Sequence, residues 1–191
     1  MSLSIADRVT SLLGRTRAGI ADEDFAALYA RAHVIVFRYV YGLCGGPWQE
    51  VEDLTAETFL RAWRARGRFE GDEEAAVGWL LQIARRQVID AYRRRRLGHD
   101  DQELILEYVP APDAGPEEQA QAREQWGILW RLLAGLPDDQ REMLVLRYML
   151  GWRVNRIARH FGLAENSVSV TLRRVLQRLR RAWPQPQERI R

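Results

Sequence analysis

The sequence predicts an all-α protein of two small helical domains, joined by a flexible acidic linker and with a helix-turn-helix in the C-terminal domain. Apolar residues recur at helical spacing along most of its 191 residues, and no stretch alternates convincingly with the period of two that a half-buried strand requires. Between the two halves, residues 97–122 contain seven acidic residues, three prolines and no arginine. Helical periodicity on both sides of such a segment predicts two domains.

The first domain is expected at residues 24–96, after a lead-in at residues 1–23. Its first helix, over 24–44, ends at a Gly-Gly-Pro sequence and has a predicted core stripe of Phe25, Leu28, Tyr29, Ala32, Val36, Phe37, Val40 and Cys44. The second helix, roughly 48–66, has a predicted buried stripe of Trp48, Val51, Thr55, Phe59, Ala62 and Trp63. A loop with the sequence GRFEGDEE follows, and a third helix completes the domain.

The third helix has two unlike faces. Small and aliphatic residues form its predicted core face: Ala76, Leu80, Ala84, Val88 and Ala91. The opposite face consists of Trp79, Gln82, Arg86, Ile89 and Arg93. This mixture suits single-stranded nucleic acid, because aromatic and aliphatic groups can meet unstacked bases while arginines follow the backbone. The pattern favours equally a second interpretation, in which Trp79 and Ile89 pack beneath the neighbouring loop or against the first helix.

The outward face of the second helix carries paired charges around an exposed leucine: Asp53, Glu57, Leu60, Arg61 and Arg64. An apolar side chain among paired charges is typical of a protein-binding patch. From the residues alone, a plainly solvated face is as good an interpretation. A metal or acid–base site at Asp53 and Glu57 is poorly supported, because no histidine or further fixed carboxylate accompanies them.

The segment from 97 to 116 is predicted to be the linker between the domains. Its acids and prolines are typical of a solvated tether. A second hypothesis is that an acidic tether between two basic domains imitates nucleic-acid phosphate and occupies a basic channel.

The second domain is expected at residues 117–183, before a tail at 184–191. Its helices are predicted near 117–134, 138–149, 153–160 and 165–182. The last two, with a glycine-containing turn between them, have the spacing of a helix-turn-helix, whose second helix enters the major groove. The predicted core of that second helix is Val168, Leu172, Val175, Leu176 and Leu179, and its outward face holds Asn166, Val170, Arg173, Arg174, Gln177 and Arg181.

Those outward residue types read base edges: arginine pairs with guanine, asparagine or glutamine with adenine, and an aliphatic side chain with the thymine methyl group. Arg153, Arg156 and Arg159 on the preceding helix are candidates to hold phosphates. The alternative is a helical hairpin whose arginine face is only solvated.

Composition excludes several other classes. The net charge is only +3, although all 29 basic residues are arginine. The single cysteine, Cys44, excludes an intrachain disulfide and is predicted to be buried. The three histidines are scattered, and we find no glycine-rich phosphate loop or Ser/His/Asp constellation. We therefore expect no enzyme activity, no cofactor and no metal. With no membrane span or signal-peptide pattern, we expect a cytoplasmic protein without membrane insertion.

Taken together, three segments resemble the bacterial RNA polymerase sigma factors of the extracytoplasmic-function (ECF) type. The sequence DLTAETFLRAW at 53–63 resembles the core-binding signature of their region 2, and residues 68–96 resemble its promoter-melting and minus-ten-reading segment. Residues 132–180 resemble region 4, which reads the minus-thirty-five element. Some positions depart from the pattern: Ala56 stands where glutamine is common, and Arg153 where serine or threonine is common.

The resemblance implies three groups of site residues. Docking to the polymerase would involve Asp53, Leu54, Glu57, Leu60, Arg61 and Arg64. Minus-ten and single-strand binding would involve Arg68, Phe69, Trp79, Gln82, Arg86, Ile89 and Arg93. Minus-thirty-five binding would involve Arg153, Arg156, Asn166, Ser167, Ser169, Val170, Arg173, Arg174 and Gln177.

The implied partners are core RNA polymerase, through its β′ clamp helices and β flap, promoter DNA in duplex and single-stranded form, and an anti-sigma factor. The function would be that of a dissociable, non-enzymatic initiation factor. Two alternatives stay open: a stand-alone helix-turn-helix regulator that binds duplex DNA, and a helical protein-binding adaptor that touches no DNA.

Overall fold

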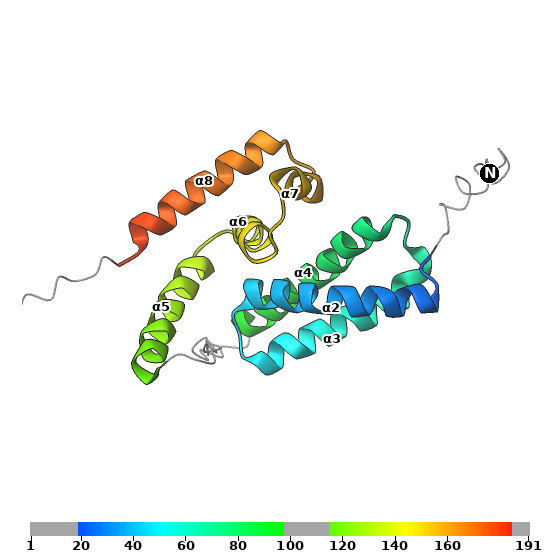
Figure 1. Ribbon diagram of the computed structural model, residues 1–191, viewed down its shortest axis with the longest axis horizontal. Coiled ribbons are helices and arrows are strands. Elements are labelled where there is room, and N and C mark those ends of the chain that lie inside the picture. Colours follow the sequence, from blue (N-terminus) through cyan, green and yellow to red (C-terminus); the bar gives the residue numbers. More distant parts are fainter. Residues whose placement is uncertain (1–18, 98–114, 185–191) are drawn as a thin grey trace, which may run out of the picture. The chain divides into compact units, whose positions relative to one another are not determined.

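The structure is a computed structural model that describes residues 19–97 and 115–184. Within these residues every regular element is a helix, as predicted (Figure 1). The elements are α2 (Asp22–Cys44), α3 (Trp48–Ala65), η1 (Arg66–Arg68), α4 (Glu73–Leu97), α5 (Pro116–Ala134), α6 (Asp138–Leu144), η2 (Val145–Met149), α7 (Val154–Phe161) and α8 (Glu165–Ala182). Apart from the segment after α6, the helices were thus predicted to within a few residues at each end.

The described residues form two compact units. Most of α2, with α3, η1 and α4, makes up the first unit, and α5 to α8 make up the second together with residues 41–48. Most of the predicted linker lies outside the described residues, as do most of the predicted lead-in and of the tail. No helix in the described parts of the chain is long and apolar enough to cross a membrane.

The first unit is a helical bundle in which α2, α3 and α4 share one core. The predicted core face of α4 is confirmed at four of its five positions, since Ala76, Leu80, Ala84 and Val88 are all buried. The predicted stripes of α2 and α3 were too wide. Tyr29, Trp48 and Trp63 are 46%, 40% and 37% exposed. Trp48 is the first residue of α3, and Trp63 lies at the edge of that helix's buried face, so neither indole is fully covered.

A buried hydrogen bond crosses the first unit from α4 to α3. Gln87, only 4% exposed, donates from Nε2 to Oγ1 of Thr58 at 3.1 Å. The Thr58 hydroxyl in turn donates to the carbonyl oxygen of Leu54 at 2.7 Å. Buried polar groups need such partners, because burying one unpaired is costly. The bond therefore fixes the register of α4 on α3.

The second unit contains the predicted helix-turn-helix. Gly162 ends α7 in the left-handed conformation (φ 65°), and the amide of Leu163 donates to the carbonyl of Ala158 at 2.9 Å. This is how glycine commonly ends a helix and turns the chain into the next one. α6 and α7 both pack on α8. Its predicted core is confirmed at Val168, Leu172 and Val175.

The segment after α6 differs from the prediction. An uninterrupted α-helix was expected over 138–149, but the last five residues form a π-helical turn, η2. The amide of Leu150 donates to the carbonyl of Val145 at 3.1 Å, which closes the wider turn. Such turns often occur near functional sites in helical proteins. Here η2 leads directly into the entry of the helix-turn-helix.

Candidate polymerase and nucleic-acid interfaces

The outward face of α3 is a mixed patch of charges and one apolar side chain. Asp53, Arg61 and Arg64 are exposed, and Leu60 is 50% exposed. Arg61 donates from Nε to Oε1 of Glu57 at 2.7 Å. This hydrogen bond, with the positive charges of Arg61 and Arg64, lowers the pKa of Glu57 below its usual value. The patch therefore presents a fixed anion beside an exposed leucine.

Leu54 does not belong to that patch. The sequence motif places it among the docking residues, but its side chain is buried in the first unit. Leu54 lies on the stripe of α3 that also buries Val51, Thr55, Thr58 and Phe59. Its carbonyl oxygen accepts the Thr58 hydroxyl. The prediction of a direct contact from Leu54 is thus corrected: it is a core residue beneath the patch.

The outward face of α4 is polar at its exposed positions and partly covered at its apolar ones. Gln82, Arg86 and Arg93 are exposed, whereas Trp79 and Ile89 are only partly so. The Trp79 ring lies 5.0 Å from the ring of Phe69, centroid to centroid. The loop before α4 therefore covers part of the indole, as the second sequence interpretation stated. The rest of the indole is open to solvent beside the exposed polar positions.

Arg66, which sequence reasoning missed, clamps the loop that carries Arg68 and Phe69. Its Nε and Nη2 atoms donate to Oδ1 of Asp22 at 3.0 and 2.9 Å, and Nη1 donates to the carbonyl of Trp63 at 2.9 Å. Its guanidinium also lies 3.5 Å from the centroid of the Trp63 ring, a cation–π contact. One side chain thereby joins the start of α2, the end of α3 and the loop.

The chain before α2 also holds this loop. The amide of Gly19 donates to the carbonyl of Phe69, and the amide of Ile20 donates to that of Arg66, both at 2.9 Å. Gly19 has φ 93°, and a Cβ atom there would lie 2.9 Å from Cα of Gly67. The close approach of two backbone segments therefore requires glycine. No periodicity in the sequence signals it.

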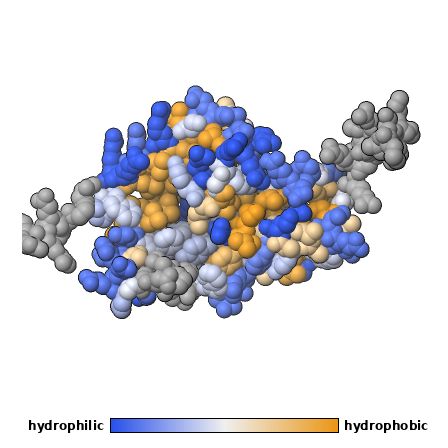
Figure 2. All heavy atoms as spheres, viewed as in Figure 1, coloured by the Kyte–Doolittle hydropathy of each residue, from blue (hydrophilic) through white to orange (hydrophobic). Residues whose placement is uncertain are grey.

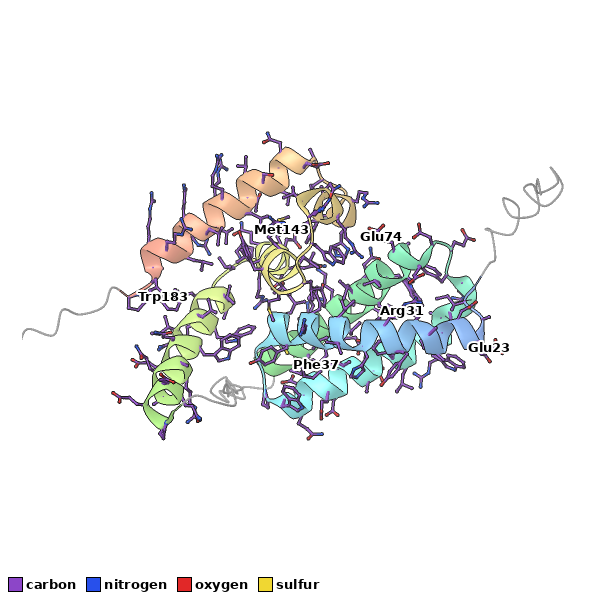
Figure 3. The ribbon with its side chains drawn as sticks, in the orientation of Figure 1. Glu23, Arg31, Phe37, Glu74, Met143 and Trp183 are labelled. Atoms are coloured by element: carbon purple, nitrogen blue, oxygen red, sulfur yellow. The ribbon has the colours of Figure 1, made fainter. Side chains whose placement is uncertain are left out.

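The outward face of α8 is polar for most of its length. Its predicted base-reading residues are exposed except Val170, which is partly buried: Asn166, Ser167, Ser169, Arg173, Arg174 and Gln177. Hydrophilic side chains stand out along this helix in Figure 2, and its long side chains project away from α6 in Figure 3. The structure thus brings the predicted minus-thirty-five residues of α8 onto one helix face.

The start of α7 is basic and has no side-chain cap. Arg153 is the N-cap residue and makes no side-chain hydrogen bond to the helix end. It is exposed, whereas Arg156 is partly buried with its guanidinium 4.0 Å from the centroid of the Trp152 ring. Trp152 itself is 6% exposed. Arg159, the third predicted phosphate-binding arginine, is exposed like Arg153, so only Arg156 is partly covered.

His160, which the sequence showed without an obvious partner, forms a buried pair with Glu142. The Nε2 atom of His160 lies 2.9 Å from Oε1 of Glu142, and the two side chains are 7% and 1% exposed. Among the residues that the structure describes, no group of three or more histidine, cysteine or acidic side chains could hold a metal ion.

Comparison with known proteins identifies the family to which both units belong. Family models described as Sigma-70 region 2 and Sigma-70, region 4 match residues 28–97 and 126–179. The ECF RNA polymerase sigma factor SigL of Mycobacterium tuberculosis is 31% identical over 163 residues, which cover 81% of this chain and 85% of SigL. The chain belongs to the ECF sigma factor family. Region 2 of this ECF sigma factor thus corresponds to α2, α3 and α4, and region 4 includes the helix-turn-helix.

Other relatives agree with this assignment. The ECF sigma factor BldN of Streptomyces coelicolor is 31% identical over 177 residues, and this chain spans only 66% of its length. Two solved structures share the fold, each with a TM-score of 0.60: RpoE bound to the anti-sigma factor NepR from Bartonella quintana and CnrH bound to the cytosolic domain of CnrY. They are 23% and 24% identical to this chain. The matches cover 84% and 92% of this chain and 96% of each solved chain.

Proposed function

We propose that this chain is a dissociable sigma factor that binds core RNA polymerase, recognises promoter DNA and promotes strand opening. The observation that carries the proposal is the separation of three unlike faces within a sigma-factor fold. α3 presents a charged patch with an exposed leucine, α4 presents exposed polar residues beside an indole, and α8 presents base-reading residue types. A protein that only bound duplex DNA would need the last of these alone.

The α3 patch is the proposed docking site for the β′ clamp helices. Leu60 would supply the apolar contact at its centre, and Asp53, Glu57, Arg61 and Arg64 would form the polar rim that sets orientation. The carboxylate of Glu57 is charged throughout the neutral range, as for any glutamate, and Arg61 lowers its pKa further. The β flap is the proposed partner of region 4.

The α4 face and its loop are the proposed site of strand opening. Unpairing and unstacking promoter bases costs a few kcal/mol each unless the displaced bases find new contacts. The open part of Trp79 can stack on such a base, and Arg86 and Arg93 can follow the strand's phosphates. Gln82, Ile89, Arg68 and Phe69 complete this site. The Arg66 clamp holds the loop in place, so the site is formed before the strands part.

The α8 face is the proposed reader of the minus-thirty-five element. Arg173, Arg174, Asn166 and Gln177 would contact base edges in the major groove, and Val170 a thymine methyl group. Ser167 and Ser169, with Arg153 and Arg156, would contact the flanking backbone. These contacts position region 4 on duplex DNA that stays closed.

The chain is proposed to act without chemistry of its own, since nucleotide joining belongs to the polymerase. We also propose a cytoplasmic location and control by an anti-sigma factor. Support for that control comes from two proteins of the same fold: RpoE was solved with the anti-sigma factor NepR, and CnrH with the cytosolic domain of CnrY.

Run-off transcription tests the proposal. Purified core polymerase from the source bacterium is incubated with a random promoter library, alone, with the wild-type chain, or with the Arg173→Ala/Gln177→Ala variant. We expect defined start sites only with the wild-type chain and weaker, less selective initiation with the variant. Duplex binding by the chain alone, without start sites, would instead establish a stand-alone regulator. No salt-dependent DNA binding and no start sites would leave the adaptor interpretation.

A further inference from the structure

A buried ionisable pair joins α6 to α7, the first helix of the helix-turn-helix, within a largely apolar core. Glu142 of α6 and His160 of α7 meet at 2.9 Å with almost no exposure. A buried carboxylate is costly without a partner, and apolar side chains of similar size would often serve stability as well. What such a pair does supply is a fixed orientation, here of the imidazole ring.

The imidazole in turn fixes the indole of Trp152. The two rings meet edge to face, with centroids 5.6 Å apart and an interplanar angle of 85°. The backbone of Trp152 is held on both sides, because its amide donates to the carbonyl of Leu146 and its carbonyl accepts from Nη1 of Arg147, both at 2.9 Å. The ring therefore has little freedom to turn.

The guanidinium of Arg156 lies on this fixed indole, 4.0 Å from the ring centroid. Stacking engages the flat face of a guanidinium, whereas hydrogen bonds to phosphate are made from its edge. A stacked arginine thus keeps the geometry for phosphate and has already lost much of the side-chain freedom that binding would otherwise remove. Arg156 is one of the residues proposed above to contact the DNA backbone.

We propose that Trp152 and His160 are positioning residues that hold Arg156 ready for a phosphate of the minus-thirty-five duplex. The inference rests on the proposed function and adds a role that the helix face alone does not assign. The buried Glu142 orients the imidazole of His160, and that ring orients the indole of Trp152. The indole in turn holds the guanidinium of Arg156.

Holoenzyme binding to a promoter duplex mapped by run-off transcription tests this chain of contacts. Full-length variants are compared by equilibrium binding at a series of salt concentrations. Arg156→Ala should weaken binding and lower the slope of log K against log salt by about 0.9, the loss of one phosphate contact. Trp152→Leu should weaken binding roughly five-fold, because the Arg156 side chain must then be ordered when it binds phosphate. Trp152→Phe, which retains an aromatic face, should recover most of that loss.

A double-mutant cycle separates positioning from general damage. In the Arg156→Ala background, Trp152→Leu should have almost no further effect, because nothing remains for the indole to hold. In the background of Arg173→Ala, a residue on α8, the effects should add. His160→Gln, which can still donate to Glu142, should fall between wild type and Trp152→Leu. Thermal unfolding of each full chain checks that it folds.

Equal losses from Trp152→Leu in both backgrounds would overturn the inference, since a purely structural indole would weaken every contact of region 4. An Arg156→Ala variant with unchanged affinity and slope would also overturn it, while a normal response to Arg173→Ala would leave the proposed function intact. If neither arginine matters and no start sites appear, the proposed function itself fails.

Discussion

Regions 2 and 4 of this sigma factor solve the same problem with different chemistry. Each holds an exposed polar face, proposed above to contact DNA, on a small helical core. Region 2 uses a neutral buried hydrogen bond from Gln87 to Thr58 and a partly buried arginine clamp at Arg66. Region 4 uses a buried ionisable pair, Glu142 and His160, with an aromatic stack above it. Replacing both partners of the neutral bond by apolar groups should change the free energy of unfolding little. Removing one member of the ionisable pair should lower it much more, because the other member stays buried.

The largest effect is expected from breaking the pair in region 4. His160→Leu leaves Glu142 buried without this partner and should lower the free energy of unfolding by about 3 kcal/mol. His160→Gln retains a donor and should cost clearly less. Chemical denaturation of the two variants measures the difference. Equal losses would mean that the volume of the ring matters here and its hydrogen bond does not.

Breaking the neutral bond in region 2 should lower the free energy of unfolding by less, and a second substitution should restore most of the loss. Thr58→Val leaves the Gln87 amide buried without its acceptor, a loss of roughly 1–3 kcal/mol. Thr58→Ser keeps the hydroxyl and loses only a buried methyl group, so it should cost about 1 kcal/mol and less than Thr58→Val. Adding Gln87→Leu to Thr58→Val should restore much of the stability, because both polar groups are then gone. If the double variant were no more stable than Thr58→Val, the bond would not be the reason for the loss.

The clamp in region 2 should matter more for promoter opening than for folding. Arg66→Met removes the hydrogen bonds to Asp22 and the stack on Trp63, and an exposed contact of this kind contributes about 1 kcal/mol or less to stability. Permanganate reactivity of the melted promoter should nevertheless fall several-fold, because the loop bearing Phe69 then keeps only its backbone hydrogen bonds to Gly19 and Ile20. Core affinity, measured in parallel, should stay unchanged. Loss of core affinity would place Arg66 in the docking patch.

The smallest effect concerns Glu57. Arg61 lowers the pKa of Glu57 in the folded protein. The carboxylate is therefore charged at every pH above its ordinary pKa and loses its charge only as the pH falls through the lower pKa of the folded state. Core binding should therefore be flat from neutral pH down to about 5. Glu57→Gln should weaken core binding at neutral pH while changing the unfolding midpoint very little, because the Glu57–Arg61 pair is largely exposed. A decline in wild-type binding between neutral pH and 5 would point to a different group.

Periodicity predicted the elements of the fold well, because each helix carries its own apolar stripe. Four of the five predicted core positions of α4 and the burial of Cys44 are confirmed. Positions at the edges of stripes were not. Tyr29, Trp48 and Trp63 are more exposed than predicted, because hydrophobicity does not tell the centre of a stripe from its rim or from a helix end.

The contacts that orient the candidate sites could not be predicted from the sequence. Gln87 and Thr58 are 29 residues apart, and Glu142 and His160 are 18 apart. Such pairs depend on the register of one helix against another, which the period of a single helix does not determine. For the same reason Leu54 was assigned to the docking face by its motif although the bundle buries it. Residue type predicted which chemistry is present, and packing decides where it lies.

The most direct test of the account is whether docking and strand opening are separable within region 2. Leu60→Asp alters the exposed centre of the α3 patch, and Arg86→Ala alters the exposed face of α4. Core affinity and permanganate reactivity are measured for both. We expect Leu60→Asp to lose core binding, whereas Arg86→Ala should bind core as wild type does and open the promoter poorly. If both variants lost core binding together, the two faces would not be separate sites and the account would be wrong.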